Sequence, residues 1–437
     1  MPDLALLGGE PIRTEPYPRW PVFGDAEVQS ITKTVLSGRW GGSPYPGPNT
    51  AEFAAKFSAM QGGGFAVPMM NGTITMEVAL RAAGIGWGDE VIVPAYTFQA
   101  TAAAPMTAGA LPVIVDISPD TYCIDPQAVL TAITPKTKAI IVVHLASQMT
   151  DMDAIMDIAQ AHNLVVIEDS AHAHGARWRE MGSGTIGDFG SFSLHSAKIL
   201  TTGEGGVLLC KDERMAERAA SIIDCGRPKD ADKQIFTMGI NYRWSELHAA
   251  LGLVALERFP AQMTQRAEMA DYLEEHLHDL PGLSLLKRDP RHTRRSQYRY
   301  IFKMDPEFFG CNNDTFCYAL YNEGLPVDTG YPAMHRYDLF QPLLSRLPVP
   351  VVFPEYFNFE EMSFPVAERA SEVESVWMGE AIFRSGKQGI DDLVYGLQKM
   401  IHNRDKLPKL AVDFAEEIEA HNQKTKMLKK GVRFNHH

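Results

Sequence analysis

The sequence predicts an α/β protein whose main sheet is mostly parallel and is covered by helices on both faces. Three observations lead to this fold class. Short apolar runs alternate with helical stretches from about residue 51 to about residue 284. The runs, such as 111–116 and 164–168, are apolar almost without interruption, which is typical of parallel strands buried on both faces. After about residue 285 the alternation ends, which indicates a smaller α+β domain.

The chain is expected to contain an N-terminal arm at 1–50, a large domain at 51–284, a small C-terminal domain at 285–404 and an appended, charged, helical tail at 405–437. The arm is rich in Pro and Gly, which disfavour regular structure, and holds one predicted helix at 25–36. In the large domain we predict helices at 50–61, 74–83, 97–108, 125–132, 152–162, 213–223 and 245–256, with a further, longer helix to about 277. We predict strands at 65–70, 90–94, 111–116, 139–144, 164–168 and 206–210. In the small domain we predict a strand at 298–304, a helix at 313–323, loops up to 365 and a final helix at 390–403.

The composition excludes several classes of protein. The chain has 437 residues, 45% of them hydrophobic, which is enough for a large core. The 41 basic and 54 acidic side chains leave a formal charge of −13, which argues against a nucleic-acid partner and an anionic membrane surface. No apolar run reaches the ~18 residues of a membrane span, and the first residues lack a signal-peptide pattern. The five cysteines have no metal-ligand spacing, so we predict no metal site and expect a reducing, cytoplasmic location.

Polar and aromatic residues follow several predicted strands at the point where each strand ends. They are Asn71-Gly72-Thr73, Tyr96-Thr97-Phe98, His144 and Asp169. Ligands of open α/β sheets bind at the carboxyl ends of the strands, so we expect the functional site there.

Asp169 and Lys198 are the most informative pair in the chain. Asp169 ends an apolar run, and Lys198 lies in a Ser/Gly-rich turn that continues into Thr202-Gly203-Glu204-Gly205-Gly206. A carboxylate that keeps a pyridine nitrogen protonated and a lysine that forms a Schiff base are what pyridoxal 5'-phosphate (PLP) needs. Taken alone, each residue has a plainer alternative. Lys198 could be a surface lysine, and Asp169 could be a helix cap or a turn-forming aspartate.

Neighbouring residues fit other parts of the same cofactor. Gly72, Thr73 and Ile74 begin a helix, whose free N–H groups suit a phosphate, and Ser193 is spaced from Lys198 to bind that phosphate as well. Phe98 is placed to stack on the ring, and His172 to contact its face or its phenolic oxygen. The alternatives are a plain helix cap for the turn and for His172, and core packing for Phe98.

Asn241-Tyr242-Arg243 has two interpretations. In the first, it is a loop that ties down the start of the following helix. In the second, Asn241 reaches a phosphate in the site of a neighbouring subunit.

Together these motifs resemble the DegT/StrS-type sugar and cyclitol aminotransferases, which are fold-type-I PLP enzymes. The similarity runs from about residue 18 to about residue 402. It is carried by Asn71-Gly72-Thr73, Pro94-Ala95-Tyr96-Thr97-Phe98, Glu168-Asp169-Ser170-Ala171-His172-Ala173-His174-Gly175, Ser193 to Lys198 with the Gly-rich turn after it, and Gly239-Ile240-Asn241-Tyr242-Arg243.

The resemblance implies a fold-type-I PLP-transferase, with Lys198 catalytic and PLP held by the residues named above. It also implies a homodimer with shared active sites, in which Asn241 comes from the partner chain. Trp40, Tyr242, Arg243, Tyr331 and His335 match positions that line the substrate pocket of the family, with interface or core packing as the alternative.

Two subgroups are most similar to this chain, the scyllo-inosose aminotransferases and the 3-amino-5-hydroxybenzoate synthases. Both tend to carry paired histidines near the C-terminus, where this chain has Met378-Gly379-Glu380 after Trp377.

The expected activity is transfer of an amino group from L-glutamine or L-glutamate to a keto-cyclitol or keto-sugar. A nucleotide keto-sugar is the main alternative acceptor. Two other functions on the same fold are a PLP-dependent deoxysugar dehydratase, whose relatives replace the lysine by histidine, and a non-catalytic sensor. Lys198 disfavours the first, and the intact set of Asp169, Ser193 and Lys198 disfavours the second.

Overall fold

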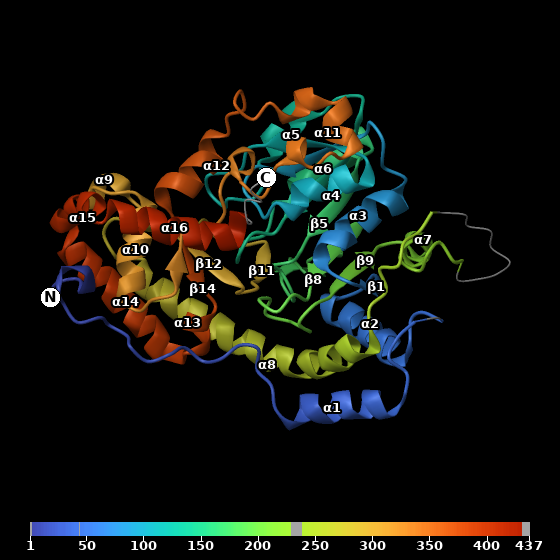
Figure 1. Cartoon of the computed structure of the whole chain (residues 1–437), viewed down its shortest axis with the longest axis horizontal. Helices are drawn as coiled ribbons and strands as arrows, with labels where there is room; N and C mark the ends of the chain where they lie inside the picture. The colour runs from blue at the N-terminus through green and yellow to red at the C-terminus, as the bar shows by residue number, and fades with distance from the viewer. Residues whose placement is uncertain (1, 43, 229–237, 431–437) are drawn as a thin grey trace, which may run out of the picture.

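A computed structural model describes residues 2–42, 44–228 and 238–430 of the chain, with the side chains of the last helix described as far as residue 422. The centre of the large domain is a seven-stranded sheet in the order β1-β9-β8-β5-β4-β2-β3 (Figure 1). Its strands are β1 (Phe65–Met69), β2 (Glu90–Pro94), β3 (Leu111–Val115), β4 (Thr137–Val143), β5 (Val165–Asp169), β8 (Phe189–Ser193) and β9 (Gly206–Cys210). Within this sheet β9 runs antiparallel to both of its neighbours, and the other pairings are parallel. The predicted α/β class with a mostly parallel sheet is confirmed.

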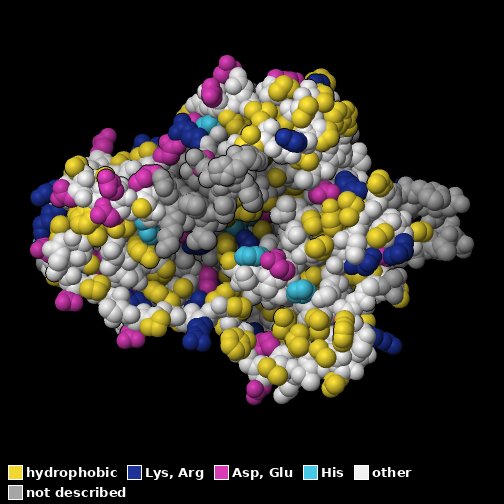
Figure 2. Space-filling view, viewed as in Figure 1, with side chains coloured by type: hydrophobic (Ala, Val, Ile, Leu, Met, Phe, Trp, Pro, Cys, Tyr) yellow, Lys and Arg dark blue, Asp and Glu magenta, His cyan; other side chains and the backbone are white. Residues whose placement is uncertain are grey.

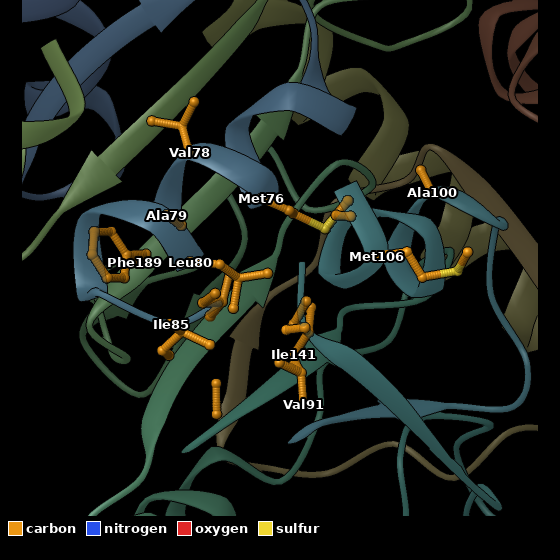
Figure 3. Close-up of a cluster of buried hydrophobic side chains, with 14 of the residues drawn as sticks. Met76, Val78, Ala79, Leu80, Ile85, Val91, Ala100, Met106, Ile141 and Phe189 are labelled. Carbon is orange, nitrogen blue, oxygen red and sulfur yellow. The ribbon is translucent and has the colours of Figure 1, made fainter. Parts of the chain in front are cut away.

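Helices cover both faces of this sheet. They are α2 (Pro48–Gln61), α3 (Gly72–Ala83), α4 (Ala100–Ala108), α5 (Pro126–Ala132), α6 (Met152–His162), α7 (Glu213–Ile223) and the first half of α8 (Glu246–Leu277). Alternate strand residues point to opposite faces. Val91 and Ile141 pack under α3 and α4, as Figure 3 shows, whereas Ile92 and Ile140 pack against α5 and α6 on the other face. The continuous apolar runs of the sequence follow from this two-sided burial.

One strand of the sheet, β8, was not predicted from the sequence. Its residues include Gly190, Ser191 and Ser193, which are weak strand formers, so the segment read as part of a turn. Gly190 is required there because a Cβ atom would lie 2.3 Å from Gly184 Cα. The backbone contact with Gly184 therefore explains a residue that local propensity disfavours.

The small domain is built on a four-stranded antiparallel sheet in the order β10-β12-β14-β13. Its strands are β10 (Leu283–Leu285), β12 (Arg299–Met304), β13 (Val327–Asp328) and β14 (Ser375–Gly379). The sheet packs on α10 (Asn313–Asn322), α14 (Gly386–His402) and the second half of α8, with Phe302, Phe316 and Leu393 in the shared core. Helix α8 is continuous through Pro260 and belongs to both cores.

Several short elements complete the chain. They are η1 (Ala5–Leu7), α1 (Asp25–Leu36), β6 (Arg177–Trp178), β7 (Met181–Gly182), β11 (His292–Arg294), α9 (Pro306–Phe309), η2 (Met334–Arg336), η3 (Pro342–Leu344), α11 (Pro348–Val352), η4 (Pro354–Phe357), α12 (Pro365–Arg369), η5 (Ala370–Glu374), α13 (Ala381–Arg384), η6 (Arg404–Lys406), α15 (Leu407–Asp413) and α16 (Ala415–Lys430). The segment predicted as loops up to residue 365 thus contains short helical turns. Among the described helices, none is long and apolar enough to cross a bilayer.

Several predicted boundaries moved by a few residues, and the two helices predicted between 245 and 277 are one continuous helix, α8. The helix predicted at 97–108 begins at Ala100, because Thr97 and Phe98 form the loop that leaves β2. The residues 229–237 of the loop predicted after α7, and residues 431–437 of the predicted tail, lie outside the described residues.

Candidate active site

A cavity of about 660 Å³ lies at the carboxyl edge of the large sheet, beside the small domain. Figure 2 shows a hollow in the middle of the molecule with histidine, acidic and basic side chains at its rim. The ends of β2, β4, β5 and β8 and the start of α3 all contribute to its wall. Of the predicted site residues, it is lined by Gly72, Thr73, Ile74, Phe98, Asp169, His172, Ser193, Lys198 and Tyr331.

The start of α3 forms an anion-binding corner of this cavity. The Asn71 side chain accepts a hydrogen bond from the N–H of Ile74 at 2.9 Å, which fixes the first turn. Gly72 packs so closely on β8 that a Cβ atom there would lie 2.8 Å from the Cβ of Ser193. The first N–H groups of a helix have no partner inside the helix and carry partial positive charge. With the hydroxyls of Thr73 and Ser193 beside them, they suit a phosphate group.

Asp169 places a buried carboxylate at the end of β5. Its Oδ2 accepts a hydrogen bond from the Thr101 hydroxyl at 2.9 Å, and its Oδ1 accepts one from the N–H of Ala171 at 3.2 Å. Burial raises the pKa of Asp169 above its usual value, and the two hydrogen bonds and the charge of Lys198 only partly oppose this effect. A protonated ring nitrogen in the cavity would supply the positive partner that the carboxylate needs.

Lys198 reaches the same cavity from the loop between β8 and β9. Its Nζ lies 4.4 Å from the centre of the Tyr298 ring, a cation–π contact. Its backbone N–H donates to His195 O at 2.8 Å, and the indole N–H of Trp20 donates to Ser196 O at 2.9 Å. The N-terminal arm therefore holds the loop that carries the lysine.

His172 and Tyr298 pack against each other beside Lys198, with their rings tilted by 40°. Their ring centres are 4.4 Å apart, and His172 Nδ1 accepts the N–H of Ala146 at 3.2 Å. Burial, helped by the charge of Lys198, lowers the pKa of His172 well below its usual value, so its ring is neutral. For Tyr298 burial favours the neutral phenol, but the charges of Lys198 and Arg299 outweigh it and lower the pKa.

Three contributors to the site were missed in the sequence. Thr101 follows Phe98 on the first turn of α4, and its position after the strand end was a usable signal. Tyr298 immediately precedes strand β12 of the small domain and Arg299 is its first residue, and both line the cavity. No local pattern connects them to Lys198, since only the packing of the two domains brings them together.

The other predicted site residues lie outside this cavity in their own chain. Asn241 is exposed, and its backbone pairs with that of Asp224 in an isolated antiparallel β-bridge. The side chain of Asp224 accepts a hydrogen bond at Oδ1 from Arg243 Nη1 at 2.5 Å. Tyr242 packs against the core of the large domain. Trp40 is exposed and donates its indole N–H to Val35 O at 3.1 Å, and His335 is buried with Nε2 3.1 Å from Glu368.

The fold and the cavity define an α/β protein whose site, at the carboxyl edge of its sheet and next to a lysine, is suited to a phosphate and a protonatable ring. The family model for the DegT/DnrJ/EryC1/StrS aminotransferase family matches residues 23–374. The chain belongs to this family and is an aminotransferase, as the resemblance implied.

Two relatives and one solved structure are similar over most of the chain. A Streptoalloteichus tenebrarius protein, named a candidate L-glutamine:3-amino-2,3-dideoxy-scyllo-inosose aminotransferase, is 40% identical over 93% of this chain and 99% of its own length. The L-glutamine:scyllo-inosose aminotransferase of Streptomyces griseus is 36% identical over 92% of this chain and 98% of its own. The crystal structure of 3-amino-5-hydroxybenzoic acid synthase matches with a TM-score of 0.76 and 30% identity, covering 89% of this chain and all of that one. Both subgroups named from the sequence are therefore among the relatives.

Proposed function

We propose that this protein is a PLP-dependent aminotransferase that moves the amino group of L-glutamine to a keto-cyclitol of the scyllo-inosose type. The observation that carries the proposal is the meeting of Lys198, the buried Asp169 carboxylate and the start of α3 in one cavity. The names of the similar proteins support L-glutamine as donor and a keto-cyclitol as acceptor.

The residues present fit the cofactor. The start of α3 with Thr73 and Ser193 would hold the phosphate, Asp169 with Thr101 the ring nitrogen, and Phe98 and His172 the ring faces. When bound, PLP supplies an electron sink for the amino-bearing carbon of the substrate. Lys198 Nζ would accept and return the proton of that carbon. Its contact with Tyr298 keeps the amine on the side of the cavity where the small domain closes it.

A homodimer with shared active sites is part of the proposal. Asn241 is exposed and lies outside the cavity of its own chain. In the proposed dimer its side chain would reach the cavity of the partner chain. Helix α1 and the residues before it also expose large apolar side chains, Phe23, Val28 and Leu36, which suit a subunit interface. We expect sedimentation to give a dimer. We also expect the cytoplasm as its compartment, because none of the five cysteines, all of which lie among the described residues, forms a disulfide.

The decisive experiment follows the absorbance of the PLP-loaded, full-length protein. L-glutamine alone should bleach the long-wavelength band of the lysine-bound cofactor, and scyllo-inosose added next should restore it, with release of an aminocyclitol. The Lys198→Ala variant should show neither change while keeping a native circular dichroism spectrum, because it has no amine to hold the cofactor or move the proton.

Each half of the experiment tests one half of the proposal. No bleaching by L-glutamine, or by L-glutamate in its place, would contradict the aminotransferase assignment to these residues. Bleaching by L-glutamine that only a nucleotide keto-sugar reverses would contradict the keto-cyclitol acceptor.

A further inference from the structure

A second pocket of about 360 Å³ borders the catalytic cavity, and we call it the distal pocket. Ala197, Tyr298 and Arg299 line both spaces. Because Ala197 is next to Lys198, the distal pocket begins within one residue of the catalytic lysine. The distal pocket and the catalytic cavity therefore adjoin each other at Tyr298 and Arg299.

The outer wall of the distal pocket comes from the part of the chain after residue 404, which contains α15 and α16 and which we call the C-terminal extension. His421 of α16 lines the pocket, and its ring packs on Tyr318 and Tyr321 of α10 at centroid distances of 5.2 and 4.5 Å. Ile418 and Asn422, on the same side of α16, are buried. The match to the family model ends at residue 374, so this wall lies in a part of the chain outside the matched residues.

The polar groups of the distal pocket are held in place by ion pairs. Asp328 Oδ2 is 3.1 Å from Arg299 Nη1, and its Oδ1 accepts the N–H of Gly330 at 2.8 Å. The two carboxylate oxygens of Glu380 share the Nε–H of Arg384, at 2.8 and 2.9 Å, and Glu380 Oε2 also accepts a hydrogen bond from Arg266 Nη2 at 3.2 Å. Fixed carboxylates and a guanidinium bind hydroxyl groups, which donate to the first and accept from the second.

The same lining disfavours a nucleotide. Arg299 is the one guanidinium among the described residues that line the distal pocket, and Asp328 already balances its charge, so the lining offers a diphosphate no excess positive charge. Tyr321 and His421 instead offer flat faces for the C–H face of a saturated ring.

We propose that the distal pocket binds a hydroxylated ring of the amino acceptor, with Tyr321 and His421 packing on the ring and the Arg299–Asp328 pair bonding to its hydroxyls. This inference rests on the proposed function and narrows it to acceptors that are uncharged or cationic polyols. His421 is then a specificity-determining residue supplied by the C-terminal extension.

Calorimetric titration of the PLP-loaded, full-length protein with scyllo-inositol tests the inference, because this polyol has the hydroxyls of an acceptor but no carbonyl to react. We expect binding to the wild type, and binding about five- to tenfold weaker in His421→Ala and in Tyr321→Ala, from the loss of one ring contact each. His276→Ala is the matched control, since His276 packs on Tyr272 at 4.3 Å in the same way but on the exposed surface of α8. UDP-glucose should not compete with scyllo-inositol.

The outcomes separate this inference from the proposed function. If the wild type does not bind scyllo-inositol, or if both pocket variants bind it as well as the wild type does, the distal pocket is not an acceptor site. Competition by UDP-glucose would overturn the exclusion of nucleotides. The proposed function fails separately, if L-glutamine does not bleach the wild-type absorbance. Circular dichroism spectra of the variants check their folding.

Discussion

Asp169 shows how a single side chain connects the large sheet to the chemistry of the cavity. It ends β5, and the N–H of the next residue, Ser170, donates to Ser191 O on β8 at 2.8 Å, so the sheet fixes its backbone on both sides. Its carboxylate is only 7% exposed, and burial raises its pKa. A buried carboxylate is unfavourable unless a positive group pairs with it, and the ring nitrogen of the proposed cofactor would be such a group.

We predict that Asp169→Asn slows the bleaching by L-glutamine by about 100- to 1000-fold, the usual effect of removing one charge-stabilising group from an active site. An amide cannot keep the ring nitrogen protonated, although it fills the same space. Single-turnover stopped-flow absorbance measures the rate.

Thr101→Val is the matched control at the same carboxylate. It removes one hydrogen bond to Asp169 and keeps the charge, so we expect a loss of about tenfold or less. Equal rates in wild type and Asp169→Asn would contradict the assigned role of the carboxylate.

At the scale of elements, one buried ion pair joins two helices of the small domain to the N-terminal arm. Lys399 on α14 lies 2.8 Å from Glu323 at the end of α10, and the two side chains are 1% and 0% exposed. Lys399 Nζ also donates to Glu10 O at 2.9 Å, and Glu323 Oε1 accepts the N–H of Ala5 at 2.8 Å. Figure 1 shows the start of the arm beside these helices. The arm is therefore tied to the small domain before it reaches the loop of Lys198.

We predict that Lys399→Met lowers the free energy of unfolding by about 3–5 kcal/mol, because it leaves the charge of Glu323 buried without a partner. The double variant Lys399→Met with Glu323→Gln should regain a large part of the loss. Urea denaturation followed by circular dichroism measures both. A loss below about 1 kcal/mol in the single variant would show that the pair is not essential to the packing of α10 and α14.

At the scale of the whole molecule, buried neutral histidines make stability depend on pH. Burial lowers the pKa of His174 and of His292 to about 3, from a usual value of 6.5. The unfolded chain binds a proton at each of them below pH 6.5, whereas the folded protein does not do so until about pH 3. Their contribution to stability is thus complete above pH 6.5 and is lost as the pH falls through this window.

We predict that His174→Phe reduces the dependence of unfolding free energy on pH by about 1.4 kcal/mol per pH unit between pH 6 and pH 4. Phenylalanine suits the site, because His174 packs between Phe57 and Phe192. Urea denaturation at several pH values gives the slope. The exposed His276→Gln should keep the wild-type slope, and the same slope in the His174 and His276 variants would contradict the prediction.

Much of the fold and part of the site could be predicted from the sequence. Strand β2 and helices α1, α6 and α7 lie where their apolar periodicity placed them, since that signal is local. Asp169 and the start of α3 could be predicted because each lies at the end of a predicted strand, and parallel strands bring their carboxyl ends to one edge. Lys198 could be predicted from its Ser/Gly-rich turn and from its residue type. Strand β8 could not, because Gly190 is there for a contact with Gly184 that no local pattern records.

The sequence by itself therefore determined the α/β class and singled out the lysine and the carboxylate that line the cavity, because these signals depend on residues close together in the chain. Only the tertiary structure decided what surrounds them. Tyr298 and Arg299 reach the cavity from the small domain, and His421 closes the distal pocket from the C-terminal extension. Contacts between residues so far apart depend on how helices and sheets pack, and packing leaves no periodic trace in the sequence.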